Sequence, residues 1–79
     1  MQREETDSDI EISRLELEWR QRYEASIAAR AAYQALAADR TAKAELLDAA
    51  RERLERAEAA KSRIAEKIER LEDLVLSRG

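Results

Sequence analysis

The chain of 79 residues contains no cysteine, proline or histidine, and its one glycine is the last residue, Gly79. Without cysteine it cannot form a disulfide or use a thiol nucleophile. Without cysteine and histidine it lacks the usual ligands of zinc, haem and iron–sulfur clusters. Without glycine-rich segments it has no loop of the kind that cradles a phosphate. We therefore expect no catalytic residue, no metal and no cofactor, and we predict that the protein is not an enzyme.

Uninterrupted apolar stretches are short, such as Leu74-Val75-Leu76. A helix needs about 20 successive apolar residues to cross a bilayer, so we expect no membrane segment. The first nine residues are largely polar, and four of them are acidic, unlike a secretory signal, so we expect a cytoplasmic protein. The formal net charge of −3 disfavours nucleic acid as a partner. Arginine outnumbers lysine 12 to 3, a bias that fits a GC-rich bacterium or its phage.

Strong helix formers dominate the chain: alanine, glutamate, arginine, leucine, glutamine and lysine. Ser8 and Glu11 form a capping-box pattern, which predicts that the first helix begins at Ser8. Residues 1–7 then form a flexible acidic tail, and residues 8–79 form a single coiled-coil domain. At the other end, Arg78 followed by Gly79 is typical of a helix terminus.

A heptad repeat with Ile12 at position a keeps one register as far as Val75. Its a positions are Ile12, Trp19, Ser26, Tyr33, Arg40, Leu47, Leu54, Lys61, Ile68 and Val75. Its d positions are Leu15, Arg22, Ala29, Leu36, Lys43, Ala50, Ala57, Ile64, Leu71 and Arg78. The mostly apolar pattern predicts coiled-coil packing. Its weak point is the middle, where Arg40 and Lys43 occupy core positions.

The charged middle of the repeat favours an all-α antiparallel hairpin, with helices over about 8–38 and 42–77. The turn then falls at residues 39–42, where Arg40 and Lys43 reach water, and residue i faces roughly residue 83 − i. Such a hairpin is roughly 45–55 Å long at about 1.5 Å per residue. The alternative is one continuous helix in an antiparallel dimer. The unbroken register and the lack of glycine, proline or asparagine at the turn favour that alternative.

The hairpin prediction includes several details. Asp39 or Thr41 would cap the second helix. One layer is poor, because Arg22 faces Lys61, and their long stems would have to carry the two charges apart. A second, shallow stripe of apolar residues flanks the seam, and it suggests that hairpins pair into a four-helix bundle or dock on a partner. This stripe comprises Ala28, Ala32, Ala35, Ala42, Leu46 and Ala49.

Five apolar side chains are the candidates for partner binding. Trp19 and Tyr23 lie one turn apart, and tryptophan and tyrosine are enriched in interface hot spots. Leu71, Leu74 and Val75 belong to the most apolar stretch of the chain, near its C-terminal end. Trp19 also fits a core position, so Tyr23 is the better contact candidate of the two aromatic residues.

The sequence thus predicts a non-enzymatic interaction module that self-associates as a dimer, binds a partner protein through an apolar helix face, or does both. Such modules serve as adaptors, chaperones or accessory subunits. One alternative is a coiled-coil spacer or a subunit of a larger phage or secretion assembly. A third is a nucleic-acid-associated regulator. We expect no small-molecule substrate. The pattern does not identify the process that the protein serves.

Overall fold

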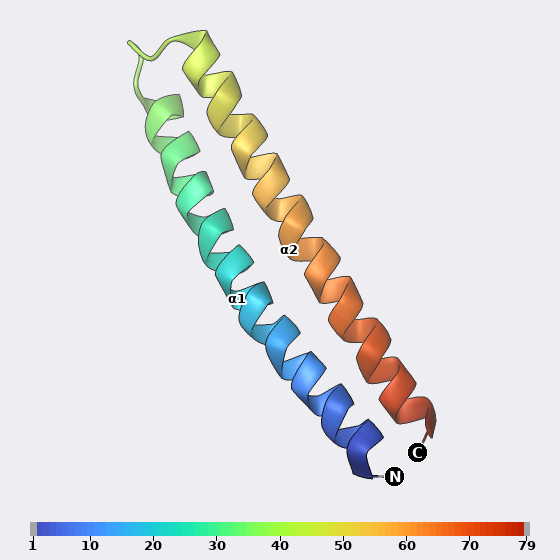
Figure 1. The fold of residues 1–79 in the computed structure, drawn as a ribbon. Coiled ribbons are helices and arrows are strands. Elements are labelled where there is room, and N and C mark those ends of the chain that lie inside the picture. The colour runs from blue at the N-terminus through green and yellow to red at the C-terminus, as the bar shows by residue number, and fades with distance from the viewer. Residues whose placement is uncertain (1, 79) are drawn as a thin grey trace.

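The computed structural model describes the backbone of residues 2–78 and the side chains of residues 9–77. It contains two helices, α1 (Gln2–Ala38) and α2 (Ala44–Arg78), which lie side by side and run in opposite directions (Figure 1). The molecule measures 62 × 16 × 14 Å. The predicted all-α hairpin is therefore confirmed, and the continuous helix is wrong.

The loop of residues 39–43 is held by its own hydrogen bonds. Asp39 Oδ1 accepts hydrogen bonds from the backbone N–H of Thr41 at 2.9 Å and from its hydroxyl at 2.7 Å. The N–H of Ala42 donates to the carbonyl of Asp39 at 3.1 Å. No described residue has a positive φ, so the loop does not need glycine or asparagine. This explains why the chain turns here without the usual turn residues.

The predicted cap of α2 by Asp39 or Thr41 is wrong, because these two side chains bond to each other within the loop. The last loop residue, Lys43, instead accepts the N–H groups of Leu46 and Leu47 at its carbonyl oxygen, at 3.0 and 3.1 Å. Glu45 lies in the first turn of α2, where a negative side chain complements the helix dipole.

The ends of the helices differ from the prediction by a few residues. Helix α1 begins at Gln2, six residues before the predicted start at Ser8, so Ser8 is not its N-cap. This early start is one reason why the molecule is longer than the expected 45–55 Å. Helix α2 begins at Ala44 rather than residue 42 and extends to Arg78. The Ser8 side chain and Gly79 lie outside the described part of the chain, and the flexibility of residues 1–7 stays a prediction.

The seam between the helices follows the heptad positions. Ser26, Ala29 and Ile64 are buried, and nearly all other apolar a and d residues are at least half-buried. Val75 is the exception, at the open end. Arg40 and Lys43 are exposed in the loop, as the hairpin prediction requires. The buried Ser26 hydroxyl is satisfied, because it donates to the carbonyl of Tyr23 at 2.7 Å.

The unfavourable layer of Arg22 and Lys61 is resolved by separating the two charges. Arg22 is exposed, whereas the ammonium of Lys61 lies 3.1 Å from a carboxylate oxygen of Glu58. The same ammonium lies 5.4 Å from the ring centroid of Tyr23. Lys61 is therefore held by one anion and one aromatic face, while Arg22 is exposed to solvent.

Candidate protein-interaction surface

The five predicted contact residues form two separate groups in the structure. Trp19 and Tyr23 lie on α1, on the seam and beside it. Leu71, Leu74 and Val75 lie in the last turns of α2, at the end of the hairpin away from the loop, which we call the open end (Figure 1). Tyr23 lines one surface groove and Val75 lines a different one. The two groups are therefore best treated as different surfaces.

The first group, Trp19 and Tyr23, makes contacts within the hairpin. The rings of Trp19 and Tyr23 stack with their centroids 5.1 Å apart and their planes 15° from parallel. Trp19 is half-buried, and Tyr23 is 42% exposed. Tyr23 borders a shallow groove of about 240 Å³ that also receives Arg30, Glu58 and Lys61. Because Tyr23 already contacts Trp19 and Lys61, only part of its ring is open to a partner.

Glu58 connects the two helices at this groove. One carboxylate oxygen accepts from Arg30 of α1 at 3.0 Å, and the other lies 3.1 Å from Lys61 Nζ. The pKa of Glu58 is lowered, first of all by the hydrogen bond from Lys61, with a further contribution from Arg30. Burial acts in the opposite direction. This cluster links the two helices by ion pairs at one level of the hairpin, and the heptad pattern alone did not reveal it.

The second group forms an exposed apolar surface at the open end. Leu74, Val75 and Leu76 are 57%, 40% and 77% exposed, whereas Leu71 is half-buried in the seam. Leu76 was not among the predicted contact residues. The sequence feature that could have identified Leu76 is the unbroken apolar run Leu74-Val75-Leu76. In this run Leu76, at position b, directly follows Val75, the last a position of the seam.

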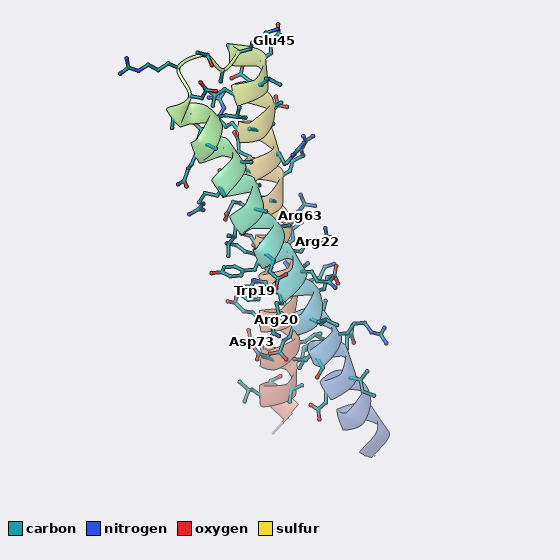
Figure 2. All side chains as sticks on the ribbon, turned by 90° about the vertical axis from the view of Figure 1, so that its left-hand side faces the viewer. Trp19, Arg20, Arg22, Glu45, Arg63 and Asp73 are labelled. Atoms are coloured by element: carbon teal, nitrogen blue, oxygen red, sulfur yellow. The ribbon has the colours of Figure 1, made fainter. Side chains whose placement is uncertain are left out.

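A groove of about 520 Å³ lies beside this run. Ile12 of α1 and Val75 and Leu76 of α2 supply its apolar lining, and Glu69, Glu72 and Asp73 supply carboxylates. Figure 2 shows Asp73 toward the open end of α2 and Glu45 at the opposite end, beside the loop. A second hollow of about 440 Å³ is lined by Arg70, Asp73, Leu74 and Ser77. The open end thus combines exposed aliphatic side chains with an acidic border.

Within the described residues, no group of three or more acidic side chains is arranged to hold a metal ion. In the same part of the chain, no helix contains a stretch long and apolar enough to cross a membrane. Comparisons of the chain with protein-family models, curated proteins and solved structures find no match. The surfaces of the hairpin itself are therefore the basis for inferring its function.

Proposed function

We propose that the protein is a non-enzymatic interaction module that holds a partner protein at the open end of the hairpin. The observation that carries this proposal is the exposed run Leu74-Val75-Leu76 beside the 520 Å³ groove. Single exposed apolar residues are common on monomers, whereas contiguous ones that border a groove are typical of interaction sites.

The chemistry of the groove indicates the kind of partner. An amphipathic helix would place its apolar face against Ile12, Val75 and Leu76. Lysine or arginine beside that face would meet Glu69, Glu72 and Asp73. Opposite charges at the rim of an interface mainly speed association and select the partner, while the apolar contact supplies most of the affinity. The partner segment is therefore an apolar helix with basic flanks.

A model peptide tests this proposal. The probe is a labelled 18-residue amphipathic helix with leucine along one face and lysine on both flanks, and binding is followed by fluorescence anisotropy. We expect the double variant Leu74→Asp/Leu76→Asp to bind at least about tenfold more weakly, since each buried leucine is worth about 1.5–3 kcal/mol. Leu71 is unsuitable for this test, because its side chain packs in the seam.

Leu46→Asp is the matched control, because Leu46 is 54% exposed on the same helix but lies beside the loop. It should bind the peptide like the unmodified protein. A peptide with glutamate in place of lysine should bind more weakly to all three proteins. If the lysine peptide does not bind the unmodified protein, or if Leu46→Asp weakens binding as much as the double variant, the open end is not the site.

A further inference from the structure

Helix α1 has an outer face with almost no charge. Residues 25–38 contain one charged side chain, Arg30, whereas residues 45–58 of α2, at the same level of the hairpin, contain eight. A line with alternating four- and three-residue spacing runs along the side of α1 away from α2. It comprises Ile10, Arg14, Leu17, Gln21, Glu24, Ala28, Ala31, Ala35 and Ala38. All nine side chains are exposed. This line, the outer face of α1, has the spacing of a second coiled-coil seam.

The hairpin also exposes more surface than its mass requires. Its accessible surface is 6679 Å², whereas a compact monomer of 9.1 kDa exposes about 4,900 Å². The excess of about 1,800 Å² is larger than the roughly 800 Å² that each chain buries in a standard interface. A second copy can therefore cover one long face and still leave the open end accessible.

Charge decides which face two copies can share. The side of α2 formed by positions c and g carries five basic and no acidic residues in the described part. It includes the cations Arg53, Arg56, Arg63, Lys67 and Arg70, all exposed and none in an ion pair within 4.0 Å among the described side chains. The side of α2 formed by positions e and b carries one basic and five acidic residues. The outer face of α1 carries one of each, Arg14 and Glu24.

Two copies that meet on the same side of α2 double its net charge, from +5 to +10 or from −4 to −8, whereas the outer face of α1 stays neutral. The part of the apolar stripe on α2, which includes Leu46 and Ala49, lies among these cations and is a poor place for two copies to pair, whereas Ala28 and Ala35 belong to the outer face of α1. Like charges brought together in an interface oppose association.

We propose that a second copy of this chain packs antiparallel against the outer face of α1. In the register that we infer, residue i of one copy faces residue 45 − i of the other. Leu17 then faces Ala28, and Ile10 faces Ala35, so each large side chain meets a small one. Gln21 faces Glu24 at the centre, where the amide can donate to the carboxylate.

The direction of pairing follows from the charges along α1. Among residues 9–18 there are four acidic side chains and one basic, and the segment that they face, residues 27–36, contains Arg30. A parallel pair would set the acidic segments of the two copies side by side. In the antiparallel pair, the acidic segment of each copy instead lies against residues of the other copy whose one charge is positive.

Sedimentation equilibrium tests the proposal with a matched pair of variants. The unmodified chain should change from 9.1 kDa to twice that mass as its concentration rises from micromolar to millimolar. Ala28→Arg should stay monomeric, whereas Ala59→Arg, on the outer face of α2, should dimerise like the unmodified chain. Both alanines are exposed in the interior of a helix, and circular dichroism verifies that both variants fold. A monomer at 1 mM, unlimited growth beyond the dimer, or dimerisation of Ala28→Arg would each overturn the proposal.

Disulfide formation between introduced cysteines tests the register. Because the chain has no native cysteine, only the introduced residues can form a disulfide. Leu17→Cys and Ala28→Cys are oxidised separately and as a mixture. The mixture should yield a covalent dimer, and each variant alone should yield at least about tenfold less, because the two like positions lie eleven residues apart along the antiparallel pair. Equal yields from the single variants would overturn the register. Because this face does not include Leu74 or Leu76, Ala28→Arg should still bind the lysine peptide, so failure of the dimer and failure of the open-end site are distinguishable.

Discussion

The two helices have similar lengths, 37 and 35 residues, but distribute their side chains differently. In α2 most large apolar residues follow the seam, with Leu46 and the run Leu74-Val75-Leu76 as exposed exceptions, and most other exposed positions are charged. In the second half of α1 the seam residues are Ser26, Ala29, Tyr33 and Leu36, and the exposed positions around them are mostly alanine. Helix α2 thus has the pattern of a helix with one apolar neighbour, whereas α1 has more uncharged surface than one neighbour covers.

This difference separates two roles of apolar residues in one small molecule. In α2, a large apolar residue at an a or d position holds the hairpin together, except at the open end. In α1, the small seam residues Ser26 and Ala29 are buried, whereas alanines outside the seam remain exposed. Substitutions at matched positions inside and outside the seam therefore test whether the comparison is right.

The largest effect is expected for Ile64→Ala in the seam of α2. Ile64 is buried, and removing three carbon atoms there costs about 2–4 kcal/mol in transfer and cavity terms. A two-helix hairpin has little stability to lose, so we expect most molecules to unfold at 25 °C. The measurement is urea unfolding followed by circular dichroism at fixed protein concentration. Leu46→Ala, exposed on the same helix, should stay within about 0.5 kcal/mol of the unmodified chain. Equal losses for the two variants would contradict this assignment of the seam.

A smaller effect is expected when alanine is enlarged in α1. Ala29→Leu adds three carbons at a buried seam position and should destabilise the hairpin by about 1–3 kcal/mol. The neighbouring substitution Ala28→Leu lies on the exposed outer face and should change the free energy of unfolding by less than about 0.5 kcal/mol. Thermal unfolding at low micromolar concentration, where the hairpin is monomeric, measures both. If Ala28→Leu were the more damaging variant, the inner and outer faces of α1 would be exchanged.

The smallest effect concerns the link between the helices at Glu58. Its pKa is lower in the folded chain than in the unfolded chain, where a glutamate titrates near 4.3. The unfolded state therefore binds more protons in that range, so this contribution to stability is present above about pH 4.3 and is lost as the pH falls through the folded pKa. Glu58→Gln should lose less stability than the unmodified chain between neutral pH and pH 3. Melting temperatures across this range measure it, with Glu55→Gln as the control. A steeper acid loss in Glu58→Gln would contradict the assignment.

The seam was predictable from the sequence because its evidence is local to each helix. The spacing of residues such as Leu15 and Ile64 defines an apolar face, and the two faces must meet. The unbroken heptad register was misleading evidence for a continuous helix, since each helix sets its own phase and the five loop residues happen to preserve it. Arg40 and Lys43 predicted the turn correctly. Burying an unpaired charge in a seam costs free energy, whereas a charged side chain in a loop stays solvated.

Other features depended on geometry that spacing does not encode. The loop needed no glycine because its backbone has no positive φ, and Asp39 stabilises it through Thr41 rather than capping α2. The position of Lys61 was unpredictable from the heptad alone, because it depends on Tyr23 and Glu58 reaching the same point from different helices. At the open end, Leu74 and Val75 were predictable from the apolar run, but the groove with its acidic border exists only where the two helices pack together.

Small-angle X-ray scattering at increasing concentration tests the central claim most directly, because it gives length and mass together. The hairpin predicts a monomer close to 62 Å long at low concentration. It then predicts a doubled mass with less than about 10 Å of added length, since the proposed register nearly superposes the two molecules. A particle of about 100 Å would mean a continuous helix, and a dimer of twice the monomer's length would mean that the outer face of α1 does not pair.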